Sequence, residues 1–95
     1  MNAHLESTPE ALWIGYDEAE QLRDLLRGIA ADEHAAAFTS RQARQAIGGI
    51  GPSMAPRELA GLTGLLTTAA GSEDLDPTWR DAAGYWSRQV EAWLS

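Results

Sequence analysis

Three tryptophans near the end of the chain, Trp79, Trp86 and Trp93, are spaced seven residues apart. An α-helix turns by about 100° per residue, so each indole lies only about 20° behind the previous one. Ala83 and Val90 fall between them, which gives the continuous seam of a helix that packs on one face. Three buried indoles contribute about 15 kcal/mol of gross burial free energy, more than the net stability of a small domain. We therefore expect this seam to lie inside the fold, with Trp93, the tryptophan nearest the end of the chain, as its most exposed member.

Two other interpretations of the seam stay open at this point. A second copy of the chain could cover the indoles, which would make the protein a homodimer or a larger structural homo-oligomer. A different protein could also cover them. Both would leave the seam exposed in the single chain.

A first helix is predicted from Asp17, because Asp17 and Glu20 have the spacing of a capping box. Whether it continues through residues 31–38 or a new helix begins at Asp32 stays open. Gly28 marks a weak point. Its expected core stripe is Ala19, Leu22, Leu25, Leu26 and Ile29.

A second, short helix is predicted to begin at Thr39, which forms a capping box with Gln42, and to stop at Gly48 and Gly49. A third is predicted from Pro56 to Gly71. Its expected core residues are Leu59, Leu62, Leu65, Leu66 and Ala69.

Gly61 and Gly64 thin one side of this third helix, so we expect another backbone to approach it closely there. The last helix should start at Asp76, followed by Pro77 in the first helical position. We find no strand pattern of useful length and no internal repeat.

The fold class that follows is all-α: a small single-domain bundle of about four helices in residues 16–95. Residues 1–15 are expected to form a loose or tucked N-terminal arm, whose apolar cluster Leu12, Trp13 and Ile14 packs against the body. A chain of 95 residues forms one core, and without cysteine it depends on packing alone. With no apolar leader and no long apolar run, we expect a cytoplasmic protein outside the membrane.

The formal net charge of −7 is unevenly distributed. Residues 5–33 hold eight acids against Arg23 and Arg27, whereas residues 35–57 hold three arginines and no acid. A net negative surface repels nucleic acid and anionic membranes and favours cationic partners, such as the active face of a nucleic-acid enzyme.

The residue types that carry catalysis or bind metals are sparse. His4 and His34 are the two histidines; His4 lies in the arm, and His34 has no acid or histidine at position 30 or 38. The stretch GGIGPS lacks the lysine of a phosphate-binding loop, and SEDLDP lacks the ligand alternation of a calcium loop. We therefore expect no enzyme activity, no cofactor and no metal.

The stretch from Phe38 to Leu66 combines a threonine, a glycine-containing turn and a second helix with an arginine near its start. It resembles the helix-turn-helix half of winged-helix regulators. The resemblance implies that Arg57 faces the major groove of DNA while Arg41 and Arg44 contact phosphates. Packing of an ordinary helical hairpin accounts for the same residues.

The stretch YDEAEQLRDLL, Tyr16 to Leu26, resembles the opening helix of the small acidic four-helix immunity proteins that neutralise bacterial nuclease toxins. The resemblance implies a class of compact acidic inhibitors, including phage-encoded antagonists of nucleic-acid enzymes. Our leading hypothesis is a non-catalytic inhibitor or regulator that binds a basic partner protein. Its expected contacts are Asp17, Glu18, Glu20 and Asp24.

Overall fold

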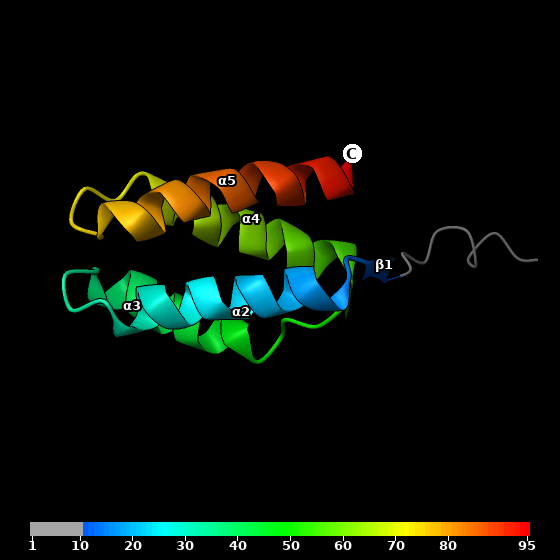
Figure 1. The fold of residues 1–95 in the computed structure, drawn as a ribbon, viewed down its shortest axis with the longest axis horizontal. Coiled ribbons are helices and arrows are strands. Elements are labelled where there is room, and N and C mark those ends of the chain that lie inside the picture. Colours follow the sequence, from blue (N-terminus) through cyan, green and yellow to red (C-terminus); the bar gives the residue numbers. More distant parts are fainter. Residues whose placement is uncertain (1–10) are drawn as a thin grey trace, which may run out of the picture.

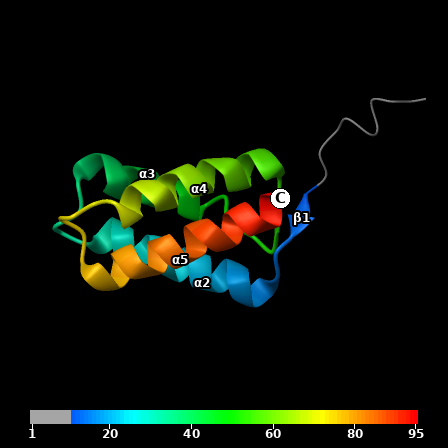
Figure 2. The ribbon, with the colours of Figure 1, turned by 90° about the horizontal axis from the view of Figure 1, so that it is seen from above.

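The structure is a computed structural model that describes residues 11–95, and these form a bundle of four helices (Figure 1). In chain order the elements are β1 (Leu12–Trp13), α2 (Tyr16–Ala31), α3 (Ala37–Ile47), β2 (Ser53–Met54), α4 (Pro56–Ala70) and α5 (Pro77–Leu94). Helices α2 and α3 form a first hairpin and α4 and α5 a second, with both hairpin loops at the same end of the bundle (Figures 1 and 2). The predicted all-α bundle is confirmed. No helix among residues 11–95 has the length and apolar character of a membrane span.

The five predicted core residues of α2 are all buried, but its start differs from the prediction. Asp17 is not the N-cap: Gly15 takes that position, with φ of 105°, and no side chain caps the helix. Glycine adopts a positive φ without steric cost, which explains why the chain turns into the helix here. The helix ends at Ala31 with Asp32 as C-cap, and α3 begins only at Ala37, so neither of the two open alternatives is correct.

Helix α3 also begins earlier than predicted. Its N-cap is Ala36, without a side-chain hydrogen bond, and Thr39 lies within the first turn, where it is buried. The predicted cap at Thr39 is therefore wrong, since packing uses this side chain as a core residue. The predicted stop before Gly48 is confirmed.

Helix α4 begins at Pro56 as predicted and ends at Ala70, one residue before the predicted Gly71, which is its C-cap. The backbone N–H of Ala55 donates to Glu58 Oε1 at 2.9 Å. Four of its five predicted core residues are buried, whereas Leu65 is half-buried. A Cβ atom added to Gly61 or Gly64 would meet nothing within 4 Å. The close backbone approach predicted at these glycines is therefore absent from the part of the chain that the structure describes.

Helix α5 starts as predicted, since Asp76 Oδ1 accepts the backbone N–H of Thr78 at 2.8 Å and Pro77 follows the cap. In the seam, Ala83, Trp86 and Val90 are buried, and Trp79 and Trp93 pack partly buried against the core. The chain's own helices thus cover the seam, which confirms the intramolecular interpretation. A homodimer joined through this seam would have to displace these core contacts.

The two hairpins correspond to each other with a constant offset in residue number. Helices α2 and α4 begin at residues 16 and 56, and α3 and α5 begin at residues 37 and 77. The offset is 40 residues in both cases (56 − 16 and 77 − 37), and two residues 40 positions apart in the chain are called counterparts. The following counterparts are buried in both hairpins: Ile14 and Met54, Ala19 and Leu59, Leu22 and Leu62, Leu26 and Leu66, Ile29 and Ala69, Ala43 and Ala83, and Ile50 and Val90.

The hairpin loops correspond as well. The backbone N–H of Asp32 donates to Ile29 O at 3.2 Å, and its counterpart Ser72 donates to Ala69 O at 3.1 Å. The expectation of no internal repeat therefore holds for residue identities but not for the structure, in which one hairpin repeats the other.

The short strands lie where a two-fold axis between the hairpins would pass. Trp13 pairs antiparallel with Ser53, and these two residues are counterparts of each other. Leu12 pairs with Met54. Across this pair, Ile14 N–H donates to Pro52 O at 2.7 Å, and Ile14 is buried, whereas Trp13 is 65 % exposed. The predicted apolar cluster is therefore only partly tucked. The first ten residues of the predicted arm lie outside the described residues.

Candidate functional site

Charged side chains divide the described part of the molecule into two sides of opposite sign. Residues 11–33 and 73–95 contain α2, α5 and the acids of both loops, and hold 11 acids against four arginines, a net charge of −7. Residues 34–72 contain α3 and α4, and hold one acid against three arginines, a net charge of +2. Helices α2 and α5 lie side by side (Figure 2), so two segments far apart in sequence combine into one acidic side.

The four acids predicted to bind a partner all lie on α2, but they are not equivalent. Glu20 forms an ion pair with Arg23 at 2.9 Å and Asp24 forms one with Arg27 at 2.7 Å. The hydrogen bond from Arg23 lowers the pKa of Glu20. Asp17 and Glu18 form no ion pair with any residue between 11 and 95. Exposed pairs of this kind are worth about 0.5 kcal/mol, so a partner's cation can replace them at little cost.

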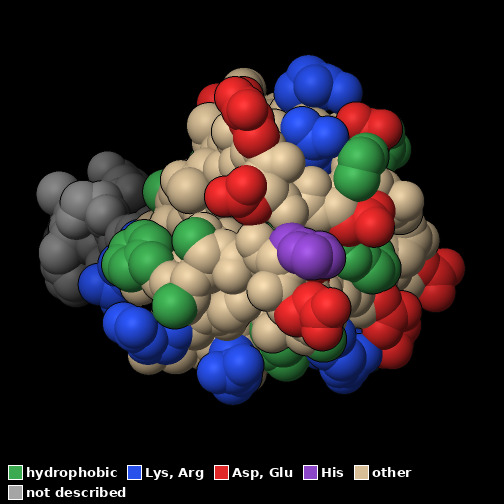
Figure 3. All heavy atoms as spheres, turned by 90° about the vertical axis from the view of Figure 1, so that its left-hand side faces the viewer, with side chains coloured by type: hydrophobic (Ala, Val, Ile, Leu, Met, Phe, Trp, Pro, Cys, Tyr) green, Lys and Arg blue, Asp and Glu red, His purple; other side chains and the backbone are tan. Residues whose placement is uncertain are grey.

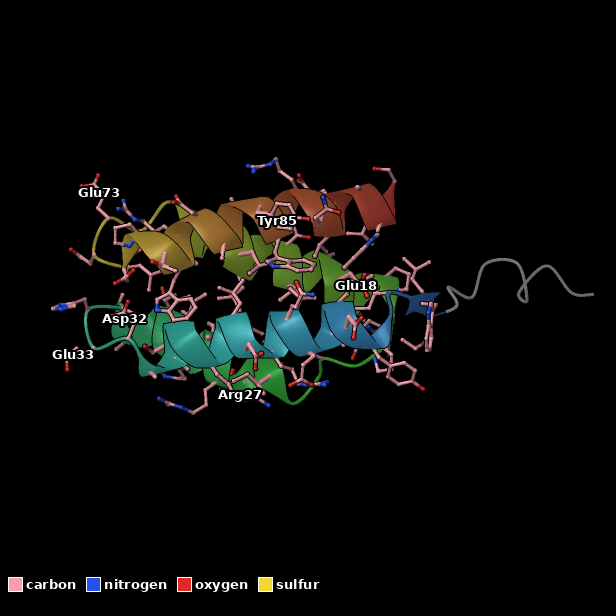
Figure 4. All side chains as sticks on the ribbon, viewed as in Figure 1. Glu18, Arg27, Asp32, Glu33, Glu73 and Tyr85 are labelled. Carbon is pink, nitrogen blue, oxygen red and sulfur yellow. The ribbon has the colours of Figure 1, made fainter. Side chains whose placement is uncertain are left out.

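A second group of acids, which was not predicted from the sequence, lies at the loop end of the bundle. Asp32 and Glu33 come from the first loop, and Glu73, Asp74 and Asp76 come from the second. Figure 3 faces this end and shows acidic side chains around a histidine, and Figure 4 shows Asp32, Glu33 and Glu73 at the end opposite Glu18. The signal in the sequence was the recurrence of an acidic segment at the same place in each hairpin.

Asp32 joins the two loops through its carboxylate. Its Oδ2 accepts the backbone N–H of Asp76 at 2.9 Å, and its Oδ1 accepts the backbone N–H of His34 at 2.8 Å. These two hydrogen bonds lower the pKa of Asp32. Asp32 therefore holds the two acidic loops against each other and stays ionised.

The three arginines of the helix-turn-helix resemblance, Arg41, Arg44 and Arg57, are exposed on the basic side. None of them forms an ion pair with another described residue. Residues 48–55 separate α3 from α4 and include β2, whereas a helix-turn-helix has a turn of about three or four residues. The connection between the two helices therefore departs from that motif.

His34 is exposed in the first loop, and His4 lies outside the described residues. Nowhere in residues 11–95 do three histidine, aspartate or glutamate side chains converge as metal ligands would.

The fold and its charges define a class of protein, an all-α bundle of two helical hairpins with opposite acidic and basic sides. Comparison of the chain with protein-family models, with curated proteins and with solved structures finds no match.

Proposed function

We propose that the chain is a non-catalytic protein-interaction module that binds a basic partner protein through its acidic side, as a small inhibitor or regulator in the cytoplasm. The observation that carries the proposal is the segregation of charge, which leaves 11 acids on the side of α2, α5 and the loops. A protein that acts on nucleic acid would suit this surface as a partner, because the cationic face with which it attracts phosphates also attracts carboxylates.

The acids act mainly on the rate of encounter. Opposite potentials on two surfaces speed association and fix orientation, while exposed charge pairs add little to the lifetime of the complex. Asp17 and Glu18 contribute without breaking any described ion pair. Glu20 and Asp24 contribute by exchanging their arginines for cations of the partner. The loop acids extend the same surface along α2.

The test begins with the protein that the intact chain retains from an extract of its own cells, identified by mass spectrometry. Association and dissociation rates with that protein are then measured at about 20 and about 150 mM salt. We expect the double variant Asp17→Asn, Glu18→Gln to lower the association rate about threefold at low salt and to leave the dissociation rate nearly unchanged.

A matched control, Asp81→Asn with Glu91→Gln, removes the same charge from exposed positions of α5. It should reduce the association rate clearly less than the α2 variant. Affinity that does not depend on salt contradicts the proposal. An equal reduction by both variants contradicts the assignment of the contacts to α2, because Asp81 and Glu91 belong to the same acidic side.

Arg41, Arg44 and Arg57 are exposed and form no ion pair within residues 11–95, which favours a second candidate, a DNA-binding regulator. A gel shift with DNA of mixed sequence tests it. Binding that disappears with Arg57→Glu and persists with the two double variants above would establish DNA as the ligand.

A further inference from the structure

A groove runs between α3 and α4 on the basic side of the molecule. It consists of two adjoining hollows of about 300 and 330 Å³, which share Gln42, Gly61 and Leu65 as lining residues. Ile50 and Met54 lie at one end, and Phe38, which is 61 % exposed, lies at the other. The groove is therefore long, largely apolar and open along its length.

The correspondence between the hairpins shows what fills the equivalent crevice on the other side. Thr39 and Ala46 flank the α3–α4 groove, and their counterparts in α5 are Trp79 and Trp86. The Trp86 indole is only 9 % exposed, and the Trp79 ring lies so close to Gly28 of α2 that an added methyl group would overlap it. The second hairpin thus supplies indoles where the first has small side chains.

The opposite wall of the groove lacks side chains too. Gly61 and Gly64 of α4 are the counterparts of Gln21 and Asp24 of α2. A Cβ atom built on either glycine meets nothing within 4 Å among the described residues. The α3 wall therefore lacks the indoles of its counterpart, the α4 wall carries no side chain at Gly61 and Gly64, and the groove has room for an aromatic side chain from outside.

Two arginines border the groove. Arg57 shares a face of α4 with Gly61 and Gly64, which follow it by four and seven residues. Arg41 follows Phe38 by three residues on α3, and both arginines are exposed and free of ion pairs within residues 11–95. Glu58, the single acid of the lining, already accepts the N–H of Ala55. The rim is therefore positive.

We propose that the α3–α4 groove binds an amphipathic helix of a partner protein, which inserts an aromatic side chain between Ala46 and Gly61 and places acidic residues against Arg41 and Arg57. Helices bind apolar grooves through anchors spaced three or four residues apart, and opposite charge at the rim fixes their orientation. This inference goes beyond the proposed function, because it concerns the opposite side of the molecule and an acidic rather than a basic ligand.

The probe is a fluorescent synthetic helix of about 15 residues with tryptophan and leucine four positions apart on one face and glutamates on its flanks. We expect saturable binding by fluorescence anisotropy. Affinity should fall at least tenfold when the peptide's tryptophan becomes alanine, and a version with lysines in place of glutamates should bind at least fivefold more weakly.

Variants of the protein use residues that its other hairpin already carries. Ala46→Trp introduces the side chain of its counterpart Trp86 and should fill the groove, lowering affinity at least tenfold while the melting temperature is kept or raised. Gly61→Gln introduces the side chain of its counterpart Gln21 in open space and should also weaken binding, which covers the case that Ala46→Trp does not fold. Arg57→Gln should weaken binding about threefold. Arg44→Gln is the charge-matched control and should not, because Arg44 is two residues from both Gln42 and Ala46 of the lining and so lies on the opposite face of α3.

The proposal is overturned if the glutamate and lysine peptides bind equally, if no peptide binds saturably, or if Ala46→Trp binds as the unchanged protein does. Sedimentation equilibrium that finds a dimer dissociated by Ala46→Trp also overturns it, because the occupant is then a second copy. The variant Asp17→Asn, Glu18→Gln should bind the peptide normally, so failure of one proposed surface is distinguishable from failure of the other.

Discussion

Replacing glycine by alanine should have opposite effects at two helical positions of this protein. A methyl group at Gly28 would lie 2.5 Å from two atoms of the Trp79 ring, whereas a methyl group at Gly64 would meet nothing within 4 Å. Alanine in a helix interior gains about 0.5–1 kcal/mol over glycine. Carbon atoms pack at about 3.5–4 Å, so at Gly28 the indole must move, and overpacking of this kind costs about 1–3 kcal/mol.

The expected balance is a loss of about 1 kcal/mol of unfolding free energy for Gly28→Ala and a gain of about 0.5–1 kcal/mol for Gly64→Ala. For a domain of this size these values shift the melting temperature by about 4–8 °C down and by a few degrees up. Urea and thermal unfolding, followed by tryptophan fluorescence and circular dichroism, measure both. In a Trp79→Ala background Gly28→Ala should become stabilising.

A result in which Gly28→Ala stabilises the unchanged protein as much as Gly64→Ala would refute the packing of the Trp79 indole on α2. It would also remove the evidence that the Trp79 indole fills the crevice between α2 and α5, with which the α3–α4 groove is compared. Equal effects of Gly28→Ala with and without Trp79 would lead to the same conclusion.

Two further predictions concern the core and the joined loops. Trp86→Ala should cost about 3–5 kcal/mol of unfolding free energy, because the indole is buried and its ring centre lies 6.1 Å from that of Trp93. The control Tyr85→Ala, at a residue 50 % exposed, should cost under about 1 kcal/mol. Equal urea midpoints for the two variants would place the Trp86 indole outside the core. Because the folded-state pKa of Asp32 is lowered, its contribution to stability is present above the ordinary pKa of an aspartate, about 4, and is lost as pH falls through the folded value. Urea midpoints measured between pH 7 and pH 3 should therefore show that Asp32→Asn is less stable than the unchanged protein at neutral pH and nearly as stable in acid. A difference in midpoint that does not narrow in acid would contradict the role of the Asp32 charge.

The core of each long helix could be predicted from the sequence, because burial requires apolar residues at helical spacing. The stripes of α2 and α5 lie where the spacing placed them, and the cap at Asp76 and the proline that follows it are local signals that act within one turn of the helix. The predicted caps at Asp17 and Thr39 failed for a physical reason. At the start of α2, Gly15 turns the chain by its positive φ and takes the cap position. In α3, Thr39 is buried in the core and does not cap the helix.

The correspondence of the hairpins was hidden because small and large residues alternate between the two copies. Where one copy has Ala46 the other has Trp86, and where one has Gln21 the other has Gly61, so the shared pattern is one of burial rather than identity. The same substitutions open the α3–α4 groove. The backbone approach predicted at Gly61 and Gly64 was wrong because the sequence does not record which neighbour, if any, lies opposite a glycine.

Spacing along the chain alone determined that this protein is a helical bundle and which residues form the inner faces of its long helices. That information is local, since a side chain's direction on a helix depends only on its position in the chain. The tertiary structure alone decided that the acids of two separate loops share one end of the bundle, that opposite charges occupy opposite sides, and that one of two equivalent crevices stays open. These properties depend on which helices become neighbours, and spacing within a helix carries no record of its neighbours.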